Sequence, residues 1–380
     1  MPKGQSHLRC VVETSAGLNR GTRIAFGAFH NLRREGTVSH AWFEKPSHLC
    51  DGEVTMDRSE NQLIRKFIGS MAGKTRGRNS VALGIGDDAA LWTPSSGRKT
   101  ILTCDWFLEG THFLRDKHGA DSVGWKCLAR AVSDIAAMGG RPRCFLLSLA
   151  LPGKLTGKWL SEFLGGLRRA SKTLRCELAG GDTTRRDEVL ICVMVIGEVL
   201  ERQAVLRSGA RTGDGIYVSG SLGEAELGLR MLRRMPGTAN PTNAPLRKHL
   251  YPRPRLELGE WLATKGLASA MIDLSDGLST DLPRLCEASG VGARIEAGDL
   301  PVSTLVGRRQ ATELALDGGD DYELLFTVKK EKERRLPQSF LGLRLTRIGE
   351  IGRKKEIVLA GAGGKRILMR SGGWDPFRGA

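Results

Sequence analysis

Short apolar runs that end beside glycine and aspartate recur along the whole chain, and this pattern constrains its fold more than any other feature. Runs such as 100–107 (TILTCDWF) and 143–151 (RCFLLSLAL) are typical of strands, and they alternate with helical patterns such as 122–139 and 156–174. A second set of strands and helices begins near residue 206. Two successive mixed sets predict an α/β (α+β) fold with two domains, residues 56–205 and residues 206–380.

The first 55 residues differ from the rest of the chain. They hold four of the seven histidines and no convincing hydrophobic period. Met56 then opens the segment MDRSENQLIRKFIG, whose spacing predicts a capped amphipathic helix. We therefore expect residues 1–55 to be a disordered extension or the product of a mis-assigned start site.

Composition excludes several classes of protein. No stretch approaches the roughly 20 uninterrupted apolar residues of a membrane span, and the N-terminus lacks the apolar core of a secretory signal. The eight cysteines are scattered without a CxxC pair, which favours buried thiols and a reducing cytoplasm. The net charge of +16 is spread over separate segments, so a basic nucleic-acid-binding protein without catalysis stays the less favoured alternative.

Acidic motifs at the ends of the apolar runs carry the functional prediction. Their segments are 84–91 (GIGDDAAL), 103–112 (TCDWFLEGTH), 133–140 (SDIAAMGG), 179–185 (AGGDTTR), 272–278 (IDLSDGL) and 317–326 (DGGDDYELLF). One such motif is usually only a turn or a helix cap, but six in one chain predict carboxylates that converge at one edge of a sheet. Converging carboxylates repel unless cations lie among them, and Mg²⁺ prefers oxygen ligands shared with phosphates. The sequence therefore predicts a magnesium-phosphate site.

Three other residues have both a structural and a functional interpretation. His112 is either a surface imidazole or a group that reaches a substrate phosphate. Arg207 is either a solvated base or a bidentate phosphate ligand. Trp374, in GGWDPF, is either a packing anchor or a stacking surface for a flat ligand ring.

The ordered series of motifs, from GIGDDAAL through LARAVSDIAAMGGRP, LAGGDTTR, IDLSDGLSTDL and GGDDYELLF to GWDPF, resembles the thiamine-monophosphate kinase family from about residue 56 to the end. The resemblance implies the two-domain fold shared with aminoimidazole-ribonucleotide synthetase, in which an N-terminal mixed sheet with helices binds ATP and Mg²⁺ and forms the interface of a homodimer. It also implies a C-terminal α/β domain, several Mg²⁺ ions, and ATP and thiamine monophosphate as substrates.

The resemblance assigns roles to individual residues. The implied metal ligands are Asp88, Thr103, Cys104, Asp105, Asp134, Asp182, Asp273 and Asp276. The implied ATP-binding residues are Gly181 and Asp182 in a turn, Arg207 and Ser275. The implied thiamine-phosphate contacts are His112, Asp320 and Trp374. No residue is expected to act as a general acid or base.

Two positions depart from the family pattern. Cys104 replaces a common threonine, and a thiol is a poor Mg²⁺ ligand, so this position can serve fully only through its main-chain carbonyl. Asp320 replaces the glutamate of the usual GGEDYEL and is one methylene shorter. The expected reaction is direct transfer of a phosphoryl group from ATP to the substrate phosphate, which is largely deprotonated at neutral pH. The nearest alternative is another ATP-using synthetase of the same fold.

Overall fold

The computed structural model describes residues 60–71, 81–85, 89–238, 241, 243–361 and 365–377. The chain divides into two units, Met1–Val54 and Thr55–Ala380. The first unit, and with it the extension predicted at residues 1–55, lies outside the described residues. All that follows concerns the second unit. It begins with the predicted amphipathic helix, α1 (Glu60–Met71), which buries Leu63 in the core.

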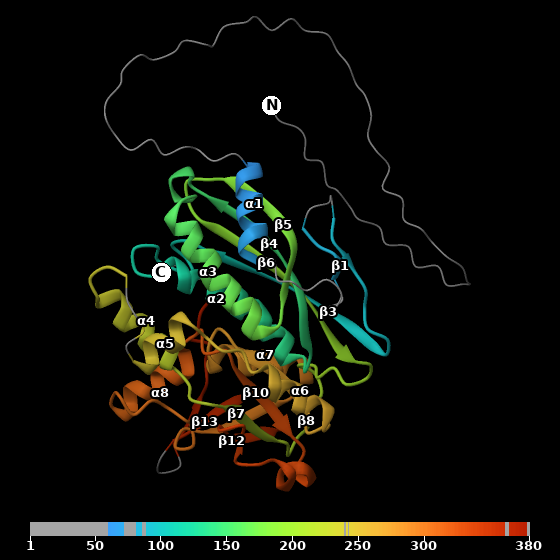
Figure 1. Cartoon of the computed structure of the whole chain (residues 1–380). Coiled ribbons are helices and arrows are strands. Elements are labelled where there is room, and N and C mark those ends of the chain that lie inside the picture. The colour runs from blue at the N-terminus through green and yellow to red at the C-terminus, as the bar shows by residue number, and fades with distance from the viewer. Residues whose placement is uncertain are drawn as a thin grey trace, which may run out of the picture. The chain divides into compact units, whose positions relative to one another are not determined.

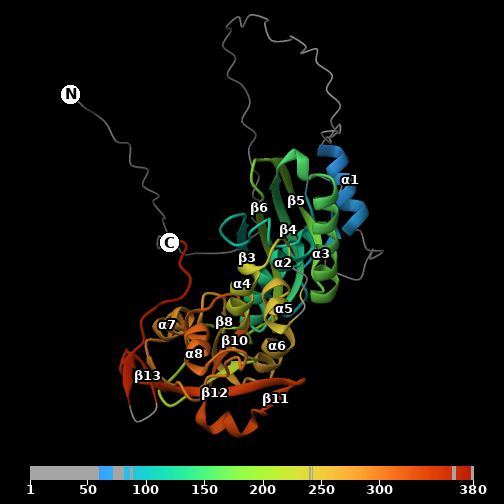
Figure 2. The same ribbon diagram turned by 90° about the vertical axis from the view of Figure 1, so that its left-hand side faces the viewer.

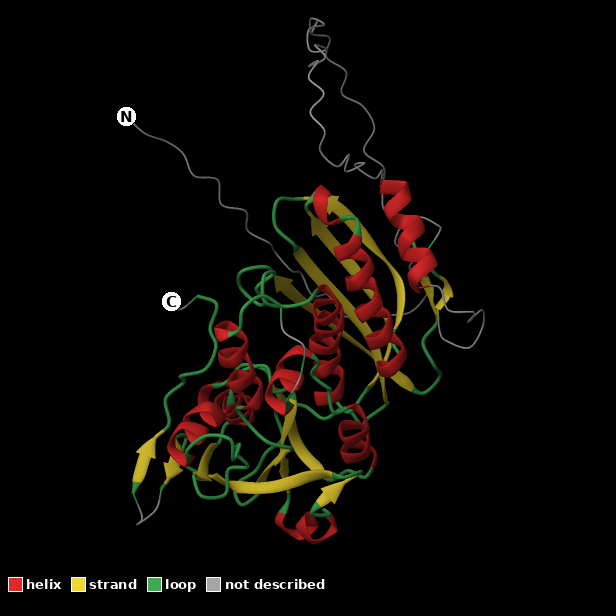
Figure 3. Cartoon of the chain, turned by 60° about the vertical axis from the view of Figure 1, so that its left-hand side comes forward, coloured by secondary structure: helices red, strands yellow, loops and turns green. Residues whose placement is uncertain are grey.

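Four strands form the first sheet, in the order β3 (Arg98–Leu108), β6 (Leu190–Leu200), β4 (Arg141–Leu151) and β5 (Glu177–Arg185). The sheet is mixed, because β6 is antiparallel to β3 and β4 while β4 is parallel to β5. The helices α2 (Ala120–Ala137) and α3 (Lys158–Leu174) cover one face (Figures 1 and 3). A 3-10 turn η1 (Gly153–Leu155) and a short antiparallel pair, β1 (Val81–Leu83) with β2 (Leu91–Trp92), complete this half.

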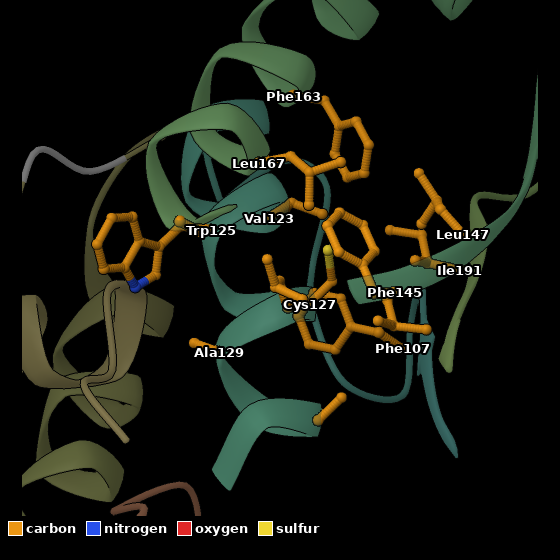
Figure 4. Close-up of a cluster of buried hydrophobic side chains, with 14 of the residues drawn as sticks. Phe107, Val123, Trp125, Cys127, Ala129, Phe145, Leu147, Phe163, Leu167 and Ile191 are labelled. Carbon is orange, nitrogen blue, oxygen red and sulfur yellow. The ribbon is translucent and has the colours of Figure 1, made fainter. Parts of the chain in front are cut away.

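Alternating side chains of this sheet build the first core. Phe107 of β3, Phe145 of β4 and Ile191 of β6 point toward α2 and α3 and are at most 1% exposed (Figure 4). Each such side chain contributes roughly 1.5–3 kcal/mol by leaving water. The two helices approach closely at Gly124, where a Cβ would lie 2.0 Å from the carbonyl oxygen of Phe163. This close contact fixes α2 against α3.

The second sheet has eight strands. Its path runs β14 (Arg366–Leu368), β13 (Ile357–Ala360), β9 (Gly292–Glu296), β12 (Leu343–Gly352), β7 (Gly215–Ser219), β10 (Glu323–Val328) and β8 (Ala268–Leu274), with β11 (Ser339–Phe340) beside β12. All neighbours are antiparallel except β13 and β9. The accompanying helices are α4 (Glu224–Arg234), α5 (Ala244–Leu250), α6 (Leu256–Thr264), α7 (Leu278–Ser289) and α8 (Arg308–Asp317), with the 3-10 helix η2 (Lys330–Arg335).

Helices cover both faces of the second sheet. On one face α7 and α8 bury side chains such as Leu282 against Ile272 and Leu325. On the other face α6 and the end of α2 join the cluster that contains Phe326. Strand β10 is consequently buried along its whole length, which explains its nearly continuous apolar sequence ELLFTV. Helices α4 and α5 pack against each other beside α2 (Figure 2).

The mixed α/β architecture predicted from the sequence is confirmed. The predicted strands at 100–107 and 143–151 and the two long helices are present. One local prediction was wrong: the segment around Gly181 and Asp182 was expected to be a turn but lies inside β5, paired in parallel with β4. In the part of the chain that the structure describes, no helix is long and apolar enough to cross a membrane.

Candidate functional site

One face of α2 carries three charged residues at four-residue spacing: Lys126, Arg130 and Asp134. Residues four apart lie one above another on a helix, so these side chains form a row along the helix. Asp134 lies near the C-terminal end of α2, where it accepts a hydrogen bond from the hydroxyl of Thr103 on β3. Lys126 lies two turns earlier and is 1% exposed.

Asp105, Asp134, Asp273 and Asp276, which we call the carboxylate cluster, come from three segments of the chain, namely β3, α2 and the end of β8 with the loop after it. Strand alternation turns Thr103 and Asp105 toward α2, whereas Asp273 ends β8 and is 4% exposed. The pKa of Asp105 is raised to about 6, mainly by burial. The charge of Arg130 opposes this rise, whereas the charges of Asp134 and Asp276 add to it. Burial, then the charge of Asp134, raises the pKa of Asp273 well above its ordinary value.

The chemistry of the carboxylate cluster fits a hard divalent cation. Carboxylates that raise one another's pKa are relieved by a positive ion among them. Within the described ranges, however, no three His, Cys, Asp or Glu side chains are close enough to hold a metal by themselves. Mg²⁺ commonly takes only one or two carboxylates and completes its shell with waters and substrate phosphates, so the cluster suits a metal that arrives with a nucleotide.

Among the described residues, one implied metal ligand, Cys104, turns its side chain away from the cluster. The expectation that the side chain of Cys104 is a metal ligand was wrong. Strand alternation turns this side chain to the outer face of the sheet, where its Sγ lies 3.3 Å from that of Cys192. Only its main-chain carbonyl remains as a ligand. Asp88 lies outside the described residues.

Asp182 and Gly181 also lie away from the cluster. They are exposed on β5, at the opposite edge of the sheet from β3, about 14 Å away at three strand spacings. Gly181 permits close pairing there, because a Cβ would lie 1.9 Å from the carbonyl oxygen of Leu147. Burial raises the pKa of Asp134, and the hydrogen bond from Thr103 and then the charge of Arg207, an exposed residue, partly oppose this rise. Arg207 is therefore near the cluster.

A pocket of about 280 Å³ adjoins the carboxylate cluster and brings the three implied substrate residues together. His112, Asp320 and Trp374 line it, together with Ser275 and Asp276. The rings of His112 and Trp374 are 6.4 Å apart at 55°. The full lining also includes Thr111, Arg130, Glu226, Leu229, Arg233, His249, Asp317, Gly319, Gly372 and Gly373.

His112 is a neutral hydrogen-bond donor at pH 7. Burial lowers its pKa to about 4, and the charge of Arg130 lowers it further. The backbone N–H of Leu108 donates to its Nδ1 at 3.0 Å, so the ring proton is on Nε2. The Nε2–H group is then the donor that the ring offers to a ligand in the pocket.

Asp320 is held by a buried polar network. Lys126 Nζ donates to its Oδ2 at 2.7 Å, and the hydroxyl of Tyr322 donates to its Oδ1 at 2.7 Å. Burial alone would raise the pKa of Asp320, but the charges of Lys126 and Arg130 hold it well below its usual range. Its backbone adopts φ 67°, uncommon for a residue other than glycine, and its N–H donates to the carbonyl of Ser275.

The network continues from Lys126 into the interior. Lys126 Nζ lies 3.3 Å from Nδ1 of His249, whose Nε2 lies 3.0 Å from Nε2 of His118. Nδ1 of His118 is 3.1 Å from the carbonyl of Leu114. Because an ammonium group can only donate, Nδ1 of His249 accepts from Lys126.

The loop at Ser275 and Asp276 is fixed from both sides. The buried carboxylate of Asp281 accepts hydrogen bonds from the N–H groups of Ser275 and Asp276 at 3.1 and 3.0 Å. The carbonyl of Asp276 accepts from the N–H of Trp374 at 2.9 Å, which brings the C-terminal segment to the pocket. Asp281 had no assigned role in the sequence, although it opens the helix that follows the aspartate motif.

Lys126 and Arg130 were also missed, because charged residues on an amphipathic helix are usually solvated. A signal was present in their spacing: both share a helical face with Asp134, the residue that the motif did identify. His249 carried no such signal, since α5 is only seven residues long.

Two protein families match the chain. They are the N-terminal domain of AIR synthase related proteins, over residues 86–199, and the C-terminal domain of the same proteins, over residues 211–361. The thiamine-monophosphate kinase of Bacillus subtilis (strain 168) is 35% identical over 324 residues, covering 82% of this chain and 98% of that protein.

Solved structures show the same similarity. The thiamine-monophosphate kinase of Stenotrophomonas maltophilia K279a has a TM-score of 0.70 at 36% identity, covering 81% of this chain and 97% of the other. A structure described as AaThiL complexed with AMPPCP and TMP has a TM-score of 0.65 at 32% identity, covering 84% and 97%.

Proposed function

The chain belongs to the thiamine-monophosphate kinase family, and from this membership and the pocket beside the carboxylate cluster we infer that it phosphorylates thiamine monophosphate with ATP. The observation that carries the inference is the meeting of His112, Asp320 and Trp374 around one pocket next to Asp276. The related complex with AMPPCP, an ATP analogue, and TMP supports the same two substrates.

The carboxylate cluster is the proposed Mg²⁺ site. Asp105, Asp134, Asp273 and Asp276 would hold the ions, with the hydroxyl of Thr103 orienting Asp134. Bound Mg²⁺ would neutralise the repulsion between two polyanionic substrates and stabilise the charge on the transferring group. Asp88, Asp182 and Gly181 stay as proposed ligands of metal or ATP from the family resemblance, and Arg207 as a ligand of the ATP phosphates.

The pocket residues are proposed to bind the acceptor. His112 would donate its Nε2–H to the substrate phosphate, which needs the neutral ring described above. Trp374, 45% exposed, would stack on a ring of thiamine. Asp320 would accept a hydrogen bond or face the positive thiazolium ring, since its pKa keeps it ionised at neutral pH.

The chain needs no general base for this reaction. The second pKa of a phosphate monoester is near 6, so its oxygens are already nucleophilic at pH 7. Binding would therefore act by holding the acceptor phosphate in line with the γ-phosphorus of ATP and by excluding water.

We also propose that the chain acts as a homodimer, with residues 56–205 as the ATP-binding and dimerisation domain and residues 206–380 as the second domain. The outer face of the first sheet exposes Leu102, Trp106 and Met194 at 68, 57 and 40%. An apolar face of this kind is typical of an interface. Sedimentation of Trp106→Arg should give a monomer; an unchanged dimer would exclude this face.

The function is tested by incubating the full chain with ATP, Mg²⁺ and thiamine monophosphate and separating the products by chromatography. We expect thiamine diphosphate and ADP in equal amounts. Free thiamine serves as the control acceptor, because it lacks the phosphate nucleophile and should not react. Conversion of free thiamine, or ATP hydrolysis without thiamine diphosphate, would contradict the proposal.

A further inference from the structure

Arg130 lies between the carboxylate cluster and the pocket, and neither the motifs nor the family resemblance gave it a role. It is one helical turn from Lys126 on one side and from Asp134 on the other. It lines the 280 Å³ pocket. Its charge acts on Asp105 and Asp276 of the cluster and also on Asp320 of the pocket. The guanidinium thus reaches both halves of the site.

Aromatic packing, and no carboxylate, holds the Arg130 side chain. Its guanidinium carbon is 5.2 Å from the ring centre of Phe107, which is 1% exposed and stacks on Phe113. Its Nε is buried without a hydrogen-bond partner, and over the described ranges no ion pair involves this arginine. Each buried donor left unpaired costs about 1–3 kcal/mol, so a group with these unused donors is favoured where a ligand supplies the acceptors.

Two other cations, Lys126 and Arg255, bind carboxylates directly. Lys126 is bound to Asp320 at 2.7 Å, and Arg255 binds Glu323 through Nε at 2.7 Å. Arg130 differs from them because its charge is attracted by several carboxylates while its N–H groups donate to none of them. This is the arrangement expected of a cation that binds an anionic ligand.

We propose that Arg130 binds the phosphate group of thiamine monophosphate and remains in contact with the phosphoryl group during its transfer; this rests on the kinase function inferred above. A guanidinium matches two phosphate oxygens at once. Arg130 lies between His112 and Asp320, which line the acceptor pocket, and Asp105 and Asp276, which belong to the metal side. The acceptor phosphate must lie between these same groups to reach the donor.

The transfer step is balanced without a proton. A lone pair of an acceptor phosphate oxygen forms a bond to the γ-phosphorus of ATP. The bond from that phosphorus to the β–γ bridging oxygen breaks, and its electron pair leaves with ADP. Negative charge on the oxygens of the transferring group then lies beside the guanidinium, which is how arginines accelerate phosphoryl transfer elsewhere.

Binding measurements on the full chain separate phosphate recognition from recognition of the ring. Isothermal titration calorimetry gives the affinity for thiamine monophosphate and for free thiamine in the wild type and in Arg130→Gln. We expect the variant to bind thiamine monophosphate about 10- to 100-fold more weakly, because it loses charge-assisted hydrogen bonds to the phosphate. Its affinity for free thiamine should stay within about twofold of the wild type. The kcat should fall by about 10²-fold or more.

Arg309→Gln is the matched control, because it removes the same charge from a side chain that is 94% exposed on α8. It should change neither affinity. Arg130→Lys keeps the charge and loses the planar fork, so its affinity for thiamine monophosphate should fall between those of the wild type and the glutamine variant.

Thermal unfolding establishes that each variant is folded, and if the glutamine variant is not, the lysine variant carries the test. Unchanged affinity for thiamine monophosphate in the folded variant overturns the proposal, and so does an equal loss for both ligands. The function inferred above fails separately, if the wild type binds thiamine monophosphate but forms no thiamine diphosphate.

Discussion

The ion pair between Lys126 and Asp320 should stabilise the fold as well as shape the pocket. Lys126 is 1% exposed, and its Nζ lies 2.7 Å from a carboxylate that comes from a loop 194 positions later in the chain. Replacing it by methionine fills a similar volume and leaves Asp320 without its closest cation. We therefore expect Lys126→Met to destabilise the protein.

The size of the effect follows from what remains around Asp320. Removing one partner of a buried pair typically costs about 3–5 kcal/mol. The side chain of Asp320 is 27% exposed and keeps the hydrogen bond from Tyr322 and the charge of Arg130. These features place Lys126→Met at the lower end, about 3 kcal/mol. The double variant Lys126→Met/Asp320→Asn removes both charges and should recover about 2 kcal/mol of the summed losses.

Urea unfolding at pH 7 measures the four free energies of this cycle. Lys158→Met is the control, because Lys158 is 91% exposed in a pair with Glu162 at 3.8 Å, and its loss should cost less than about 1 kcal/mol. If the two single losses add within about 0.5 kcal/mol, the pair is not coupled and the reasoning is refuted.

Three further predictions concern activity and pH. Asp134→Asn should lower kcat by about 10²-fold by removing a metal ligand, whereas a near-normal rate at saturating Mg²⁺ would count against the cluster. Trp374→Ala should raise the KM for thiamine monophosphate about 2- to 10-fold with little change in kcat, since a stacking contact is worth about 0.5–1.5 kcal/mol; an unchanged KM would show that the ring only packs. Burial lowers the pKa of His118 to about 4, so the unfolded chain binds a proton that the folded chain does not between pH 6.5 and 4. The free energy of unfolding should therefore fall by up to about 3 kcal/mol as the pH drops through this range, and His118→Asn should show a smaller fall in urea titrations at pH 7 and 4.5; equal slopes for both proteins would contradict this.

The spacing of apolar residues predicted most of the fold, because in most helices and strands the buried positions can be recognised from the sequence of that element alone. The run ELLFTV of β10 is apolar on both faces and could be read directly as a buried strand. The segment 177–185 could not, since its glycines and polar residues show no alternation. It becomes β5 through parallel pairing with β4, a partner that the local sequence does not specify.

Some residues of the candidate site could likewise be predicted from the local sequence, and others could not. Aspartates beside glycine at strand ends indicated Asp105, Asp134 and Asp273 as neighbours, which the structure brings together. Successive residues of a strand point to opposite faces of the sheet. The side chain of Cys104 points to the outer face, so its thiol is not part of the carboxylate cluster. Lys126 was not predicted because a buried cation becomes recognisable only when its distant partner is located.

The row of Lys126, Arg130 and Asp134 along α2 has a consequence for the choice of acceptor substrate. Lys126 and Asp134 are eight residues apart on one rigid helix, about 12 Å along its axis. In the proposed site Lys126 holds Asp320, a contact of the acceptor, and Asp134 holds the metal of the nucleotide. A helix does not stretch, so the separation between these two contacts would stay constant. An alcohol or phosphate ester that is longer or shorter than thiamine monophosphate would place its terminal oxygen off the line of attack. In the proposed site, selection by molecular length would follow from the backbone of a single helix.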